Sequence, residues 1–297
     1  MKIDLVVTYV DNVNEDWQRE YAKYCNTSLP TFFRTGRNAL KYFLRGVSQN
    51  LPFINQVFLV VQNQSEVPDY VNRDTIRIVT HDEFIPEKYL PTFNCNVIEA
   101  FLYKIEGLSE RFIYANDDIF VINRLCPFDF FVGHEAITYY EKLAIQRNRF
   151  AFYESIVMNS NELVLGISRG LSFEYGYVVQ PHHTIRPYFK SLFEECIEQY
   201  FQKIEPKFTR FRSPINYNDY VVDLYQRKIG RERDLKLINN ISIYNNVSDN
   251  ELKVLLLKDS DTICILDHFQ NIDIFENKIL IDFFESKFPN VSKYEKI

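Results

Sequence analysis

The sequence predicts an α/β protein built around a mainly parallel β-sheet, and two observations support this fold class. Short apolar runs rich in Val, Ile, Phe and Tyr alternate with helix-like stretches along the first third of the 297-residue chain, which is typical of parallel strands joined by crossover helices. The chain is also 46% apolar and 25% charged, so it can bury a large core and is not a disordered polypeptide. We expect a single domain over residues 1–297.

The first third contains four predicted strands and two predicted helices. The strands are β-branched and aromatic stretches with few charges, as expected for strands buried on both faces: 3–10, Val57–Val61, Ile76–Thr80 and 111–115. The helices are 39–47 and 94–108. The second helix has apolar residues at helical spacing, and Gly107 is placed to end it.

The rest of the chain gives weaker signals. Periodicity is poor from about 123 to 180, where only short β-like pieces at 136–140 and 163–167 stand out, and we interpret this region as an insertion beside the sheet. Three further elements are predicted: a helix from about 187 to 204, a strand at Thr262–Leu266 and a helix from 274 to 288.

Polar side chains follow each of the four early strands. In chain order these are Asp11, then Gln62 and Asn63, then His81 and Asp82, and last Asn116, Asp117 and Asp118. Open α/β sheets bind their ligands beyond the carboxyl ends of the strands. The pattern therefore predicts a polar crevice there, although strands often end in polar turns without any site.

The strongest candidate for chemistry is the sequence FIYANDDIF at 112–120, in which a strand delivers two adjacent carboxylates to its exit turn. Neighbouring carboxylates repel each other, and a divalent cation or a shared proton relieves that repulsion. Asp117 and Asp118 could therefore hold a hard metal ion. The alternative is a solvated turn whose Asp caps the next segment, and the motif alone leaves both open.

Three further motifs allow more than one interpretation. GISRG at 166–170 has the pattern of a nucleophile elbow around Ser168, but the aromatic residues after it show no helical stripe, so a serine hydrolase is disfavoured. The DSD sequence at 259–261 precedes a strand and is expected to be a loop. The pair His182 and His183 could bind a metal or transfer protons, or could be structural.

Several basic residues could bind phosphate or could simply be solvated: Arg34, Arg37, Arg186, Lys190, Arg210 and Arg212. The chain as a whole carries a formal net charge of −6, which does not attract nucleic acid. Its 8 glycines form no phosphate-binding loop. The five cysteines show no metal or disulfide spacing, and no signal peptide or membrane-spanning window is visible, so we expect a cytoplasmic protein.

Taken together, these segments resemble the Stealth family, which includes bacterial hexose-1-phosphate transferases of capsule and exopolysaccharide synthesis and the animal N-acetylglucosamine-1-phosphotransferase. The matching segments occur in the family's order and cover about half of the chain: 3–17, 32–64, 78–84, 89–120, 182–190 with 210–219, and 264–269. Three positions depart from the usual family pattern: Tyr9 stands where Trp is usual, Ile185 where Pro is usual, and Leu266 where Asn is usual. The second departure leaves the register between His182 and His183 open, and HTIRP favours His183.

The resemblance implies a Rossmann-like nucleotide-sugar transferase fold that moves a sugar-1-phosphate from a UDP-sugar to a hydroxyl of a glycan or lipid-linked oligosaccharide, releasing UMP. It implies Mg²⁺ or Mn²⁺ held by Asp117 and Asp118, which could also orient the nucleophile, with His183, or else His182, as acid or base and Arg212 facing phosphate. The implied substrate-binding residues are Asp11, Arg34, Asn38, Asn116, Arg186, Lys190 and Asp267. The enzyme could associate with the inner face of the cell membrane or with polysaccharide assembly machinery. A metal-dependent glycosyltransferase and an inactive carbohydrate-binding protein are the alternatives.

Overall fold

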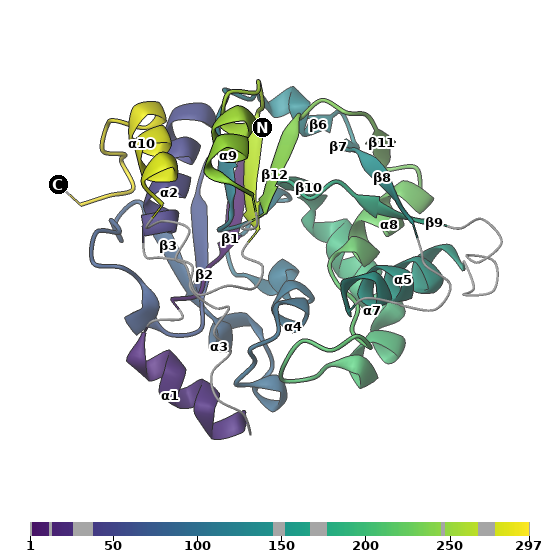
Figure 1. The fold of residues 1–297 in the computed structure, drawn as a ribbon. Helices are drawn as coiled ribbons and strands as arrows, with labels where there is room; N and C mark the ends of the chain where they lie inside the picture. The colour runs from purple at the N-terminus through teal and green to yellow at the C-terminus, as the bar shows by residue number, and fades with distance from the viewer. Residues whose placement is uncertain are drawn as a thin grey trace.

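A five-stranded sheet in the order β10-β4-β1-β2-β3 forms the centre of the computed structural model (Figure 1). The structure describes residues 2–11, 14–25, 38–144, 152–166, 177–244, 247–266 and 277–296. Four strands of the central sheet are parallel, and β10 joins its edge antiparallel to β4. The bounds are β1 Ile3–Thr8, β2 Val57–Val61, β3 Ile76–Thr80, β4 Arg111–Asn116 and β10 Arg186–Phe189. The predicted α/β class with a mainly parallel sheet is confirmed.

Both faces of this sheet are buried, because alternate residues of each strand point to opposite sides. In β1, Leu5 and Val7 belong to one apolar cluster and Val6 belongs to the other. The first cluster includes residues of α2 (Asn38–Asn50), α9 (Asp249–Leu256) and α10 (Lys278–Lys287). The second includes residues of α4 (Cys95–Glu99), α7 (Lys190–Ile204) and α8 (Tyr220–Lys228). Figure 1 shows α2, α9 and α10 on one side of the sheet and α7 and α8 on the other.

Smaller sheets extend this centre. One has the order β12-β13-β5, from Asn240–Tyr244, Thr262–Leu266 and Ile119–Val121. Another has the order β11-β7-β6, from Glu232–Asp234, Glu135–Thr138 and Phe131–Val132. A two-stranded sheet pairs β8 (Tyr140–Ala144) with β9 (Tyr177–Pro181). The remaining described helices are α1 Glu15–Tyr24, α3 His81–Phe84, α5 Phe152–Leu165, and the short turns η1 Gln64–Glu66, η2 Glu87–Tyr89, η3 Leu102–Lys104, η4 Pro127–Asp129 and η5 Glu205–Lys207.

Two predicted helices have different bounds in the structure. The stretch 94–108 is not one helix, because Phe101 leaves the helical region (φ −112°, ψ 3°) and the chain tightens into η3. With this break, four consecutive residues from Ala100 to Tyr103 are buried, which one helical stripe would not do. The stretch 187–204 begins as strand β10, which pairs with the free edge of β4, and becomes helical only at Lys190.

The β-like piece expected at 163–167 is wrong in type, because α5 continues to Leu165. Gly166, with φ of +69°, then ends that helix in the left-handed conformation. A nucleophile elbow needs a strand before its serine, so the helix at this point also removes the hydrolase interpretation, while Ser168 itself lies outside the described residues. The predicted insertion carries β6 to β9 and α5, and β7 pairs with β11 of a later segment.

Candidate active site

The site lies at the point where the strand order of the central sheet reverses direction. From β1 the chain proceeds to β2 and β3 on one side and later returns to β4 on the other, and such switch points hold the ligand crevice of open α/β sheets. The last residues of the two strands, Thr8 and Asn116, are paired. Asp11 follows β1 and is buried, and half-buried Asn116 ends β4, so both predicted residues lie at this edge.

Asp117 and Asp118 form the two-residue turn between β4 and β5. The backbone N–H of Ile265 donates to Asp118 O at 2.9 Å, which ties this turn to β13. Burial and the neighbouring Asp118 charge raise the pKa of Asp117 to about 8, and burial raises the pKa of Asp118 to about 7. Asp117 Oδ2 and Asp118 Oδ1 are buried and have no hydrogen-bond partner in the described part of the chain.

His182 and His183 lie in the turn between β9 and β10. Asn240 Nδ2 donates to His183 O at 3.0 Å, and Thr184 Oγ1 lies 2.9 Å from Thr262 Oγ1. These contacts hold the histidine turn against β12 and β13. Burial, followed by the charge of Arg186, lowers the pKa of His183 to about 4, so its imidazole is neutral at pH 7 and can accept a proton.

Asp118, His183 and Cys264 converge from three different segments. One potential ligand atom of each lies within 4.8 Å of the others. Cys264 is in β13, opposite Ile119 of β5, and the sequence did not single it out as a site residue. The spacing of residues along the chain offers no signal for this convergence, because it depends on the pairing of β13 with β5.

The donor atoms at this position fit a divalent cation. Asp118 Oδ1, which has no partner among the described residues, suits a hard ion such as Mg²⁺ or Mn²⁺, and the orphaned Asp117 Oδ2 comes from the adjacent residue but does not belong to the group within 4.8 Å. The His183 nitrogen and the Cys264 sulfur are softer donors, so oxygen coordination is expected to come from the aspartate pair.

Arg212 lies close to this convergence and is exposed to solvent. Its positive charge contributes to the lowered pKa of His183 and opposes the rise in the pKa of Glu99. Its Cζ lies 5.7 Å from the centre of the Phe152 ring. Among the described residues its guanidinium has no hydrogen bond or ion pair, so its donors are available to an anion.

Arg186 was expected to bind substrate, and the structure corrects this expectation. Its side chain is buried and forms an ion pair with Asp219, and its Nε donates to Tyr188 Oη at 3.0 Å. The Tyr188 hydroxyl in turn donates to Asp223 Oδ2 at 2.6 Å. These contacts commit the guanidinium to protein partners. Its positive charge adds to the burial that lowers the pKa of His183.

Glu99 belongs to the same buried region and was missed in the sequence. Tyr114 Oη donates to Glu99 Oε1 at 3.2 Å, and Thr8 Oγ1 lies 3.1 Å from that hydroxyl. Burial and the charge of Asp219 raise the pKa of Glu99 to about 8. The only signal was its place on the predicted helix 94–108, where it looked like an ordinary polar position.

Lys190 is corrected as well, because it lies at the opposite end of the sheet. β10 runs antiparallel to β4, so Phe189 pairs with Arg111 at the start of β4. The Lys190 ammonium donates to Ile105 O at 3.4 Å and Leu108 O at 3.5 Å. It cannot contact a ligand at the carboxyl ends of the strands.

The other predicted residues have different outcomes. His182 Nε2 lies 3.3 Å from Glu141 Oε1, outside the convergence of Asp118, His183 and Cys264. Arg34 and Asp267 lie outside the described residues. Asn38 begins α2, and its side chain also lies outside the described part.

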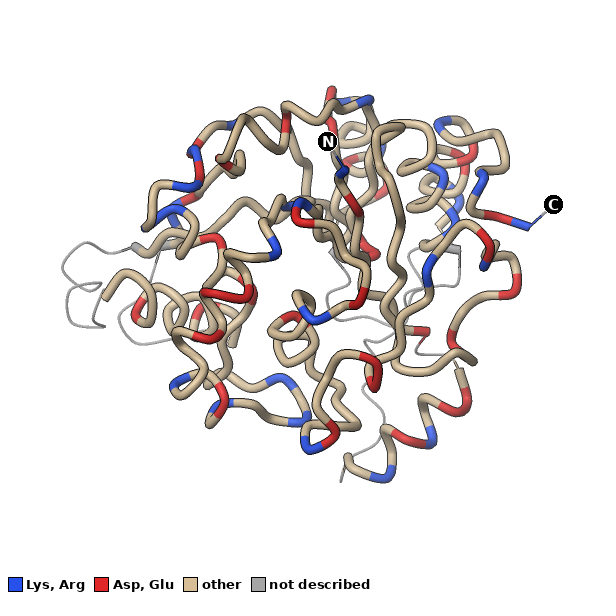
Figure 2. Tube along the Cα trace, turned by 180° about the vertical axis from the view of Figure 1, so that it is seen from behind, with Lys and Arg blue, Asp and Glu red and all other residues tan. Residues whose placement is uncertain are grey.

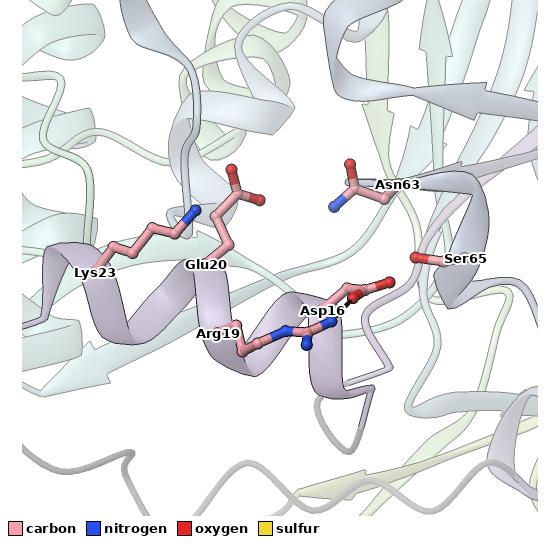
Figure 3. A pocket seen from close by; sticks show the side chains of 6 residues that line it. All are labelled: Asp16, Arg19, Glu20, Lys23, Asn63 and Ser65. Carbon is pink, nitrogen blue, oxygen red and sulfur yellow. Dashed lines mark hydrogen bonds and ion pairs between the residues drawn. The ribbon is translucent and has the colours of Figure 1, made fainter.

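A separate polar pocket of about 400 Å³ lies between α1 and the turn after β2 (Figure 3). Its lining residues are Asp16, Arg19, Glu20, Lys23, Asn63 and Ser65. Asp16 and Arg19 pair with each other, and Glu20 accepts a hydrogen bond from Gln62. Within the described part of the chain, three of its four charged side chains thus already have protein partners, the exception being Lys23, and none of its residues belongs to the Asp118 convergence.

The distribution of charge and the hydropathy of the helices do not point to a further site. Figure 2 shows acidic and basic residues interspersed along the described chain. None of the helices in the described ranges has the length and apolar character required to cross a bilayer.

Comparison of the sequence with known proteins finds one matching family model and several similar proteins. The family model described as Stealth protein CR2, conserved region 2, matches residues 33–138. The capsular polysaccharide phosphotransferase WcwK of Streptococcus pneumoniae is 28% identical, with 99% of this chain and 98% of that protein covered. The exopolysaccharide phosphotransferase cps2G of Lactiplantibacillus plantarum is 26% identical, with 99% and 96% covered. The capsular polysaccharide phosphotransferase LcbA of Aeromonas hydrophila is 32% identical, with 67% and 57% covered.

Among solved structures, the galactosyltransferase LgtC in complex with donor and acceptor sugar analogues aligns over 98% of both chains, with a TM-score of 0.45 and 10% identity.

Proposed function

Since this chain belongs to the Stealth family, we propose that it transfers a sugar-1-phosphate from a UDP-sugar to a hydroxyl of a glycan acceptor, releases UMP and serves capsule or exopolysaccharide synthesis. The relatives that match nearly its full length are named as polysaccharide phosphotransferases. The acceptor is a glycan or a lipid-linked oligosaccharide. We place the reaction in the cytoplasm, at the membrane's inner face or with polysaccharide assembly machinery when the acceptor is lipid-linked.

The observation that carries this proposal is the approach of Asp118 and His183 within 4.8 Å. In the reaction, the acceptor oxygen attacks the phosphorus that bears the sugar, and the bond from that phosphorus to the oxygen of UMP breaks. The hydroxyl proton must go to a base as the new phosphodiester forms. We assign this role to the His183 imidazole, which lies beside Asp118.

Two groups would stabilise the negative charge of the phosphates. A divalent ion, Mg²⁺ or Mn²⁺, held by Asp117 and Asp118, would supply positive charge to the phosphate oxygens when bound. Arg212 would donate its available N–H groups to the transferred phosphate, where charge accumulates in the transition state. Asp11 and Asn116 would line the donor site from the ends of β1 and β4.

The test incubates the protein with a panel of UDP-sugars, Mg²⁺ and a capsular oligosaccharide acceptor, and identifies the released nucleotide. We expect UMP, together with a phosphodiester in the product. Release of UDP would instead identify a glycosyltransferase that forms a glycosidic bond, and release of neither nucleotide would support an inactive carbohydrate-binding protein. Excess chelator should remove activity, and added Mg²⁺ or Mn²⁺ should restore it. Full activity in chelator would contradict the metal assignment.

A further inference from the structure

Two aromatic side chains at the start of α5 are exposed beside the site and have no role in the reaction as proposed above. Phe152 is 44% exposed and Tyr153 is 37% exposed, and they are the first two residues of the helix. Contiguous exposed apolar groups rimmed by polar residues mark binding surfaces, whereas single exposed apolar side chains are common. Their positions relative to the site show what such a surface could bind.

Phe152 contacts a group of the site directly, and Tyr153 is linked to Arg186 through Tyr220. The Arg212 Cζ lies 5.7 Å from the centre of the Phe152 ring. The Tyr153 hydroxyl lies 2.8 Å from the hydroxyl of Tyr220, whose ring centre is 4.8 Å from Arg186 Cζ. Phe152 therefore borders the arginine that faces phosphate, and Tyr153 borders the buried ion pair behind it.

The helix that carries these rings is firmly anchored. Asn159 Nδ2 donates to Pro214 O at 3.0 Å and to Asn216 O at 2.9 Å, and Ser160 Oγ donates to Asn218 Oδ1 at 2.9 Å. Tyr153 Oη also donates to Gln180 Oε1 at 3.2 Å. The residues that anchor α5, Pro214, Asn216 and Asn218, belong to the segment 213–218, which directly follows Arg212. The rings and the guanidinium are thus held in a fixed relation, and little ordering is lost when a ligand binds.

We propose that Phe152 and Tyr153 form the platform on which the terminal sugar of the acceptor stacks. This inference rests on the proposed function. A pyranose ring presents one face of C–H groups that packs on an aromatic ring, while its hydroxyls at the edge remain free for hydrogen bonds and for attack. Stacking beside Arg212 directs an acceptor hydroxyl toward the phosphate that this arginine faces.

The position of the platform favours the acceptor sugar over the nucleoside of the donor. The donor edge is formed by the ends of β1 and β4, with Asp11 and Asn116. Phe152 belongs to α5, which is not part of the central sheet and packs near α8 instead. Arg212 lies beside the platform, so a diphosphate that reaches Arg212 from the sheet would meet the acceptor there.

The experiment compares steady-state kinetics of Phe152→Ala, Phe152→Tyr and Phe128→Ala, with methyl glycosides of glucose, galactose and N-acetylglucosamine as acceptor probes. Phe128 is the matched control because it is 69% exposed in η4, and the residue after this turn, Phe130, packs on Phe53 before the amino end of β2. Loss of the stacked ring should raise the acceptor KM about tenfold, while the donor KM stays the same. Phe152→Tyr keeps the ring and should restore the acceptor KM, and Phe128→Ala should match the wild type.

A second measurement separates failure of this inference from failure of the proposed function. Saturation-transfer NMR with the same glycosides and UMP detects sugar binding without turnover, and we expect transfer to the wild type that is lost in Phe152→Ala. If the wild type releases no UMP from any UDP-sugar, the proposed function fails. If it does release UMP, but Phe152→Ala changes neither acceptor KM nor saturation transfer, only the platform fails. A rise in the donor KM, or no transfer to any glycoside in the wild type, would also overturn the platform.

Discussion

The two ends of the central sheet differ in how their buried aspartates are satisfied. At the amino end, Asp4 is 1% exposed, and its carboxylate accepts hydrogen bonds from Asn55 Nδ2 and from the Ser109 N–H, both at 2.8 Å. At the carboxyl end, Asp117 Oδ2 and Asp118 Oδ1 are buried without a partner among the described residues. Since an unsatisfied buried polar group costs about 1–3 kcal/mol, the carboxyl end is the less stable arrangement when no ligand is bound.

Other buried polar groups follow this contrast only in part. Near the amino end, Asn50 Nδ2 donates to Val121 O at 2.8 Å and to Ile122 O at 3.0 Å. At the carboxyl end, the Tyr9 hydroxyl and Glu66 Oε2 are also buried without a partner in the described ranges. The contrast therefore concerns the aspartates, because Arg111 Nε at the start of β4 is also buried without a partner in these ranges.

The largest expected effect is that of Asp118→Asn, which tests the carboxyl end directly. We expect turnover to fall by about 10³-fold or more, because the amide cannot supply the negative charge that a cation or the nucleophile needs. The fold should be retained, since the substitution replaces a buried carboxylate with a neutral group of the same shape. The measurements are UMP release and the thermal midpoint. A variant with normal turnover, or one that unfolds, would contradict the comparison.

The next effect concerns the two histidines. His183→Ala should lower turnover by roughly 10²-fold if the imidazole transfers a proton. His182→Ala should have a milder effect, because the structure places His182 against Glu141 and outside the Asp118 convergence. The check is UMP release by both variants at equal folded concentration. The reverse ranking would move the catalytic role to His182, and small equal effects would make both residues structural.

A smaller effect is expected for Arg212→Lys. Lysine keeps the charge but loses the planar set of donors that matches a phosphate, so turnover should fall by about tenfold or more while the fold is kept. Arg210, which the sequence left open as phosphate-binding or solvated, is not a suitable control. The Arg210 Nη1 donates to Pro91 O at 2.7 Å, and the Arg210 Cζ lies 4.0 Å from the centre of the Tyr24 ring.

The exposed Arg124 is therefore the better control for this substitution. Arg124→Lys should leave both UMP release and the thermal midpoint unchanged. If Arg212→Lys has a near-normal rate, or if its loss of rate is matched by a lower midpoint, the arginine does not clamp phosphate.

The carboxyl end was largely predictable from the sequence, because its signals are local. Strands β2 and β3 have the predicted bounds, since buried parallel strands appear as short continuous apolar runs. Once these strands are parallel, the residues that follow them must meet at one edge. For this reason Asp11 and the Asp117–Asp118 pair could be brought together from spacing alone.

Groups that depend on long-range pairing could not be predicted in this way. Cys264 reaches the site only because β13 pairs with β5, and Lys190 leaves it only because β10 runs antiparallel to β4. The burial of Arg186 against Asp219 depends on the packing of α8 behind β10. In each case the residue type suggested a role, and the tertiary contact decided which role it has.

The smallest expected effect on turnover comes from Asp4→Asn, which tests the amino end of the same sheet. An Asn side chain keeps one acceptor oxygen but presents an NH₂ group to one of the two donors that Asp4 satisfies, Asn55 Nδ2 or the Ser109 N–H. The variant should lose about 1–3 kcal/mol of unfolding free energy, measured by urea denaturation, with turnover per folded molecule unchanged. The exposed Asp74 supplies the control, and Asp74→Asn should change neither quantity. If Asp4→Asn kept its stability but lost turnover, the amino end would have a functional role, and the contrast between the two ends would no longer hold.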